Sequence, residues 1–139
     1  MTNSDRFNID DELNAKMAGG IEPVVWFNPA CSKCRTTQSI LAERGVDASY
    51  VDYQLEPPSV ADLQRVQAML GATNPRVMAR TGEVLWGELE LDDATDEEVL
   101  EALAANPSLI ERPIVVVGDK AVIARPPDRV LELIEPSAD

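Results

Sequence analysis

Cys31 and Cys34 are the two cysteines of this chain and the side chains best suited to covalent chemistry. They lie in the segment NPACSKCR, residues 28–35, directly after the apolar run VVWF at 24–27. That run predicts a buried strand, and the residues after it predict a helix that begins at about Cys31. The unpaired backbone N–H groups of a first helical turn, together with the helix dipole, stabilise a thiolate and can bind an oxyanion. The spacing therefore favours Cys31 as an activated nucleophile beside an anion site.

The alternative for these cysteines is packing, because free cysteine is often buried as a small hydrophobic residue. The strand–turn–helix context and the lack of other cysteines favour chemistry instead. The loop of low-molecular-weight phosphatases is excluded, since it needs an arginine six positions after its cysteine and Thr37 stands there. A proline before a later strand, which accompanies a thioredoxin-type CxxC motif, is present as Pro113.

Three arginines, Arg80, Arg112 and Arg125, each stand next to a predicted break in the chain. Such ends can converge on the start of the cysteine helix, where guanidinium groups would bind a tetrahedral oxyanion through paired hydrogen bonds. Considered one at a time, each of these arginines is more typical of a solvated charge on the surface. Their spacing in the sequence does not decide between a surface position and an anion site. Four other arginines are assigned to the surface: Arg35, Arg44, Arg65 and Arg129.

Composition narrows the classes of function. The 139 residues suit one domain, and the chain carries 25 acidic against 12 basic residues, a net charge of −13. This acidity argues against nucleic-acid binding, and an anionic substrate would need a local arginine cluster. The absence of histidine excludes Ser–His–Asp triads and Cys–His pairs, and two cysteines alone argue against a zinc site, so we expect no metal. The sequence shows no membrane-length apolar run and no signal peptide, which predicts a cytoplasmic protein with reduced thiols.

The remaining patterns predict an α/β order. Strands are expected at 24–27 and 49–53 around the cysteine helix at 31–44, and a hairpin at 114–117 and 121–124 precedes a last helix that ends near 134. Between these units the sequence predicts helices after Ser59, after Asn74 and after Thr95, and an acidic loop at 83–94. The leading β-α-β unit requires a parallel pair of strands, and the hairpin can complete a mixed sheet. The expected fold is a thioredoxin-like mixed sheet flanked by helices, with a helical insertion between the β-α-β unit and the C-terminal β-hairpin-α unit. We expect residues 23–135 to form this domain, with a flexible N-terminal extension at 1–22 and a tail at 136–139.

These motifs resemble those of the ArsC family, the glutaredoxin-coupled arsenate reductases, from about residue 24 to residue 134. The resemblance rests on five segments: NPAC at 28–31, EPPS at 56–59, the Arg80 segment, IERPIVV at 110–116 and RPP at 125–127. It implies that Cys31 attacks arsenate, that Arg80, Arg112 and Arg125 hold the oxyanion, and that Asn28 and Pro113 shape the site.

The resemblance also implies a cis Arg112–Pro113 bond and a monomer without a bound cofactor. A low-molecular-weight thiol such as glutathione would be the co-substrate, and glutaredoxin or thioredoxin the protein reductant. No direct contact with nucleic acid or membrane is implied.

Two positions depart from this pattern and keep alternatives open. Phe27 stands where some arsenate reductases have histidine, and Cys34 is a second thiol that many members lack. Cys34 could resolve the Cys31 adduct or form a regulatory disulfide, which leaves the thiol donor undecided. The chain is also similar, more distantly, to the Spx regulators, which carry a CxxC redox switch and bind RNA polymerase. The competing functions are thus such a regulator and a thiol oxidoreductase of another substrate.

Overall fold

The computed structural model describes residues 22–134, and a four-stranded mixed sheet organises them. Strand β1 (Val24–Phe27) pairs in parallel with β2 (Ser49–Asp52) and antiparallel with β3 (Ile114–Val117). Strand β3 pairs antiparallel with β4 (Lys120–Ile123), which gives the order β2-β1-β3-β4. The predicted β-α-β unit and β-hairpin are confirmed.

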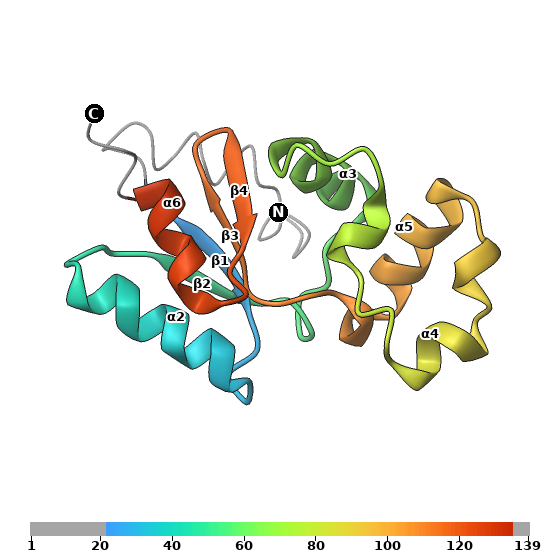
Figure 1. Cartoon of the computed structure of the whole chain (residues 1–139), viewed down its shortest axis with the longest axis horizontal. Coiled ribbons are helices and arrows are strands. Elements are labelled where there is room, and N and C mark those ends of the chain that lie inside the picture. The colour runs from blue at the N-terminus through green and yellow to red at the C-terminus, as the bar shows by residue number, and fades with distance from the viewer. Residues whose placement is uncertain (1–21, 135–139) are drawn as a thin grey trace.

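Helices enclose this sheet on both faces (Figure 1). Helix α2 (Ser32–Glu43) connects β1 to β2, and the short η5 (Pro127–Val130) and α6 (Leu131–Ile134) follow β4. The helical insertion between β2 and β3 contains six further elements: α3 (Val60–Met69), η2 (Pro75–Met78), α4 (Val84–Glu88), η3 (Leu91–Asp93), α5 (Asp96–Ala105) and η4 (Pro107–Leu109). In Figure 1 this insertion stands on the opposite side of the sheet from α2 and α6.

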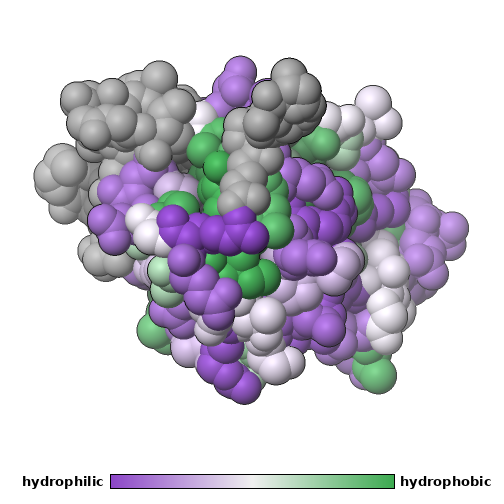
Figure 2. Space-filling model, turned by 60° about the vertical axis from the view of Figure 1, so that its left-hand side comes forward, coloured by the Kyte–Doolittle hydropathy of each residue, from purple (hydrophilic) through white to green (hydrophobic). Residues whose placement is uncertain are grey.

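Alternation along the strands divides the apolar core between the two faces. Val25 and Val115 pack with Leu41 of α2 and Val130 of η5. Their neighbours Val24, Trp26, Ile114 and Val116 point to the other face, where they meet α3 and α5 of the insertion. Because successive side chains of a strand face opposite sides, one apolar run supplies both cores. On the face shown in Figure 2, hydrophilic side chains predominate, with apolar side chains gathered at the centre and in smaller areas near the edges.

Local signals explain where the main insertion helices begin. Ser59 accepts from the Asp62 N–H, and the Asp62 carboxylate accepts from the Ser59 N–H, so a complete capping box begins α3. Thr95 and Glu98 form the equivalent box at the start of α5. Each box satisfies backbone N–H groups that would otherwise lack a partner, which is why the sequence pattern located both helices.

The prediction of an acidic loop at 83–94 is wrong, because this segment contains α4 and η3. Trp86 is buried, and its indole Nε1–H donates to Asp92 Oδ1 at 2.7 Å. Leu91 is buried in the same core. Burial of these two apolar side chains stabilises short helices among acidic residues. The sequence shows no helical spacing of apolar residues here, so it did not predict these helices.

The N-terminal extension and the C-terminal tail expected at 1–22 and 136–139 are not among the described residues, except for Glu22. Within 22–134 no helix has both the length and the apolar character that a membrane span requires.

Candidate active site at the start of helix α2

The sheet topology brings the predicted site segments to one edge. Phe27 at the end of β1 is level with Asp52 at the end of β2, and Ile114 at the start of β3 is level with Ile123 at the end of β4. Trp26 pairs with Ile114, so all four strands end or begin at the same edge. Four segments therefore meet there: the turn 28–31, Tyr53, Arg112-Pro113 and Arg125-Pro126.

Asn28 closes the turn between β1 and α2. Its side-chain Oδ1 accepts from the Ala30 N–H at 2.9 Å, and its carbonyl accepts from the Cys31 N–H at 2.9 Å. Cys31 itself is the N-cap, with extended backbone angles of φ −93° and ψ 124°. The prediction that the cysteine helix begins at about Cys31 is confirmed, since the first helical residue is Ser32.

Cys31 has the environment of an activated thiol. Burial raises its pKa, but the Cys34 N–H, the Arg112 guanidinium, the Cys34 thiol and the Lys33 N–H lower it, and the net effect is a pKa of about 7. The two N–H groups belong to the first turn of α2 and point at the sulfur because no preceding turn uses them. Cys31 is therefore ionised to a large extent near neutral pH, which is the state that attacks an electrophile.

Cys34 has the opposite character, three residues further along the helix. Its side chain has no exposed surface, and burial raises its pKa to about 12, with the nearby Cys31 sulfur adding to the rise. The Asn28 N–H donates to its sulfur at 3.4 Å and only partly offsets this effect. Cys34 is thus a protonated thiol beside the Cys31 sulfur.

Arg112 is the arginine that the structure places beside Cys31. Its cis peptide bond to Pro113 agrees with the sequence-based prediction, and a second cis bond, Arg125–Pro126, was not foreseen. Burial lowers the pKa of Arg112, but its contact with the Cys31 sulfur and the nearby Tyr53 hydroxyl raise it above its usual value. Arg112 therefore remains a cation that supports the thiolate and can bind an anion.

Arg125 contacts Arg112, Arg80 lies within electrostatic reach of Tyr53, and each of the two arginines is held by a carboxylate. The Arg125 guanidinium donates to the Arg112 carbonyl at 2.9 Å and stands 3.7 Å from Glu111 Oε1. Arg80 forms an ion pair with Glu83 at 3.0 Å, and its backbone N–H donates to the Leu109 carbonyl at 2.7 Å. Convergence of all three guanidinium groups on one anion stays a prediction.

Tyr53 is a residue of this site that the sequence reasoning did not select. It follows β2 directly, has no exposed surface, and lies within the electrostatic reach of Arg112, Cys34 and Arg80. The signal that could have found it is positional. The residue after β2 must lie beside the residue after β1, because the carboxyl ends of parallel strands share an edge.

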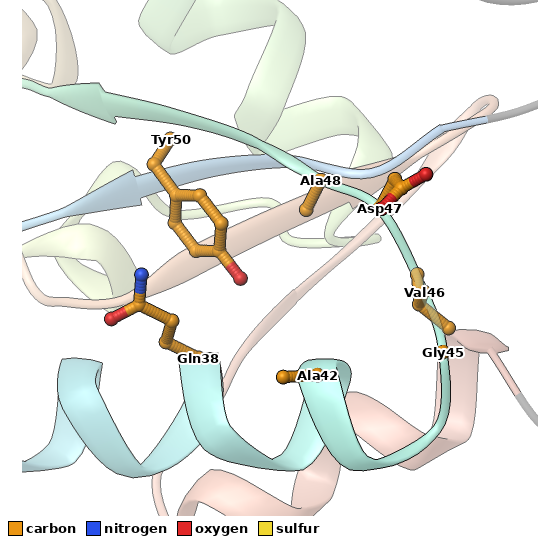
Figure 3. A pocket seen from close by; sticks show the side chains of 7 residues that line it. All are labelled: Gln38, Ala42, Gly45, Val46, Asp47, Ala48 and Tyr50. Atoms are coloured by element: carbon orange, nitrogen blue, oxygen red, sulfur yellow. The ribbon is translucent and has the colours of Figure 1, made fainter.

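A separate hollow of about 350 Å³ lies at the other end of α2 (Figure 3). It is lined by Gln38, Ala42, Gly45, Val46, Asp47, Ala48 and Tyr50. This lining offers neither a thiol nor a guanidinium, so the reactive chemistry of α2 belongs to its first turn. Among residues 22–134 no group of three or more acidic or cysteine side chains is arranged to hold a metal ion.

Comparison with known proteins gives a consistent family match. The model of the ArsC family matches residues 26–133. A protein named arsenate reductase from Haemophilus influenzae is 40% identical over 113 residues, which cover 80% of this chain and 97% of that protein. The uncharacterized protein YfgD of Escherichia coli K12 is 41% identical over 112 residues, 79% of this chain and 94% of that protein. The solved structure named arsenate reductase from Vibrio cholerae superposes with a TM-score of 0.79 at 40% sequence identity. The match covers 81% of this chain and 97% of that structure's chain.

Proposed function

Because this chain belongs to the ArsC family, we propose that it is a thiol oxidoreductase that reduces arsenate to arsenite through Cys31. The observation that carries the proposal is the contact of the Arg112 guanidinium with the Cys31 sulfur at the first turn of α2. This arrangement combines a nucleophile ionised near neutral pH with donors for an oxyanion.

The first role of the site is to bind an anion against the charge of the whole chain. The net charge of −13 repels arsenate at long range, so the local positive potential has to come from Arg112 and the start of α2. We propose that the planar guanidinium of Arg112 holds two arsenate oxygens, and that Arg80 and Arg125 complete the positive surroundings.

The second role is covalent attack. The Cys31 thiolate forms an S–As bond, and one arsenate oxygen leaves as water after it has taken protons from solvent. Arsenic is still in the +5 state at this point. Backbone N–H groups of Lys33 and Cys34, which stabilise the thiolate beforehand, then face the oxygens that carry the charge.

The third role is transfer of two electrons. A thiol must attack the Cys31 adduct so that the electron pair of the breaking bond remains on arsenic, which leaves as arsenite, while two sulfurs join in a disulfide. We propose glutathione or another low-molecular-weight thiol as the first donor and glutaredoxin or thioredoxin as the protein reductant. Attack by Cys34 is the internal alternative, with the same electron balance and a Cys31–Cys34 disulfide as its product.

The experiment is arsenate-dependent turnover of the full chain with glutathione, glutaredoxin or thioredoxin supplied in turn and arsenite measured as the product. Turnover with at least one donor, and its loss in Cys31→Ser, is the expected result. Arg44→Ala is the matched control for arginine removal, because Arg44 caps the far end of α2, about 18 Å from its start. Absence of arsenite with every donor would overturn the arsenate assignment.

A further inference from the structure

Resting on the proposed function, we infer that Tyr53 is a further substrate-binding residue, whose hydroxyl donates a hydrogen bond to an oxygen of the oxyanion held between Cys31 and Arg112. The inference begins from the place of Tyr53 in the sheet. It is the first residue after β2, and β2 lies in parallel register with β1, whose end leads into the turn at Asn28. Tyr53 therefore lies at the same edge as the nucleophile.

The burial of Val51 and Tyr53 shows on which face of the sheet Tyr53 lies. Val51 and Tyr53 are both buried in the core between the sheet and the insertion, as the two-residue period of a strand requires. Tyr50 is adjacent to Val51 in the strand, so its side chain belongs to the opposite face of the sheet. Figure 3 shows it projecting toward α2. The two tyrosines of the chain thus lie on opposite faces of the sheet, and only Tyr53 is on the side of the insertion.

The Tyr53 hydroxyl oxygen is fully buried and has no hydrogen-bond partner among the described residues. The Gln54 side chain lies near enough to influence the phenol, but not in hydrogen-bond geometry. Buried hydroxyl groups almost always have a partner, because leaving one unpaired opposes folding. A hydroxyl retained in such a place is explained when a ligand supplies the acceptor.

A second buried donor without a partner lies within electrostatic reach of this hydroxyl. Arg112 Nε is also buried and unpaired, and the Arg112 cation and the Tyr53 phenol influence each other directly. Both are N–H or O–H donors, and an anion is the ligand that accepts from two donors at once. Cys34, whose thiol contacts the Cys31 sulfur, also acts on the Tyr53 phenol, and so does the Arg80 cation.

The chemistry of a phenol suits this role. Burial raises the pKa of Tyr53 above its ordinary value, more than the neighbouring cations lower it. The hydroxyl therefore stays protonated throughout the physiological range and remains a donor. Unlike a fourth arginine, it adds a hydrogen bond without adding charge to a buried cluster.

The test compares Tyr53→Phe with wild type and with Tyr50→Phe as the matched control. Tyr53→Phe removes only the hydroxyl, and we expect kcat/KM for arsenate to fall about 10- to 100-fold, the range for a hydrogen bond to a charged group. The variant should melt at the wild-type temperature or above it, because an unpaired buried hydroxyl has been removed. Alkylation of Cys31 by the neutral reagent iodoacetamide should keep its rate and pH midpoint, and Tyr50→Phe should keep full turnover.

Three outcomes would overturn the inference. If Tyr53→Phe turns arsenate over within about twofold of a working wild-type enzyme, the hydroxyl does not bind substrate, and the proposed function stands without it. If turnover, melting temperature and Cys31 alkylation all decline together, Tyr53 has a structural role. If the wild-type chain itself produces no arsenite with any donor, the proposed function fails, and this inference with it.

Discussion

The backbone N–H of Asn28 donates to the sulfur of Cys34 across 3.4 Å, so the turn that presents Cys31 also holds the second thiol in place. The same residue accepts from the N–H groups of Ala30 and Cys31, through its side chain and its carbonyl respectively. One asparagine thereby joins the end of β1 to both cysteines. The consequence is that two thiols three residues apart have opposite environments, one at the free end of a helix and the other in the core.

The first prediction concerns the pH dependence of alkylation. With a pKa of about 7, Cys31 should react with iodoacetamide at a rate that rises with pH and reaches half its maximum near neutrality. Cys34, with a pKa of about 12, should remain unmodified in the folded chain. Mass spectrometry of the alkylated chain across a pH series checks both statements. Preferential modification of Cys34 would contradict the assignment of the nucleophile.

The second prediction concerns Arg112. Arg112→Ala removes a cation that lowers the Cys31 pKa, so the alkylation midpoint should move to higher pH. Turnover of arsenate should fall about 100-fold or more, as is typical when a donor to a developing oxyanion is lost. Arg112→Lys should restore much of the midpoint but little of the turnover, because an ammonium lacks the two-pronged guanidinium geometry. Arg44→Ala is the control, and equal behaviour of the two alanine variants would argue against a site role for Arg112.

The sequence predicted the elements that carry the candidate site because their signals are local. The start of α2 at Cys31 and the capping boxes of Ser59 and Thr95 depend on residues within one helical turn. The position of Arg112 next to a strand could likewise be predicted from the apolar run that follows it.

The features that the sequence did not disclose depend on contacts between distant segments. Trp86 and Leu91 form short helices only because the insertion buries them, and no local pattern reports that burial. In the sequence, Tyr53 cannot be distinguished from a tyrosine of the core. The register of β1 and β2 in the structure places it at the same sheet edge as the turn at Asn28. Parallel pairing joins segments that are separated by a whole helix, so such neighbours cannot be derived from spacing alone.

The third prediction concerns stability and pH. The folded chain loses the Cys31 proton at lower pH than the unfolded chain, because the folded-state pKa is about 7 against 9.0 for an unperturbed thiol. The resulting stabilisation is complete above about pH 9 and is lost as pH falls through about 7. The free energy of unfolding of wild type relative to Cys31→Ser should therefore rise by about 1 kcal/mol between about pH 6 and about pH 8. Urea unfolding at both pH values measures this difference, and a constant difference would show that the thiol is not perturbed.

The fourth prediction tests the insertion apart from the site. Asp92→Ala leaves the buried Trp86 indole N–H without its acceptor, and we expect a loss of about 1–3 kcal/mol in the free energy of unfolding. Asp93→Ala, a neighbouring exposed carboxylate, is the matched control and should change stability by less than about 0.5 kcal/mol. The Cys31 alkylation midpoint should be the same in both variants. Equal stability of the two variants would show that the Trp86 contact contributes little.

The last prediction separates the routes by which the Cys31 adduct is resolved. Cys34 is buried and protonated, yet its thiol lies close enough to Cys31 to change the pKa of that sulfur. If an external thiol attacks the adduct, Cys34→Ser should keep nearly full turnover with glutathione and glutaredoxin, because serine replaces the thiol with little change in volume. If Cys34 attacks, the variant should form the arsenate adduct once and then stop, since no internal thiol can complete the disulfide.

A rapid-quench experiment with excess enzyme distinguishes these results, because the first arsenite released comes from resolution and not from later cycles. Wild type using the internal route should release arsenite before any external thiol is added, and a Cys31–Cys34 disulfide should appear at the same rate. Wild type using the external route should release none until a donor is present. Because the buried Cys34 must give up its proton before it attacks, the internal route should also accelerate with pH well above the Cys31 midpoint, whereas attack by an external thiol should follow the pKa of the donor.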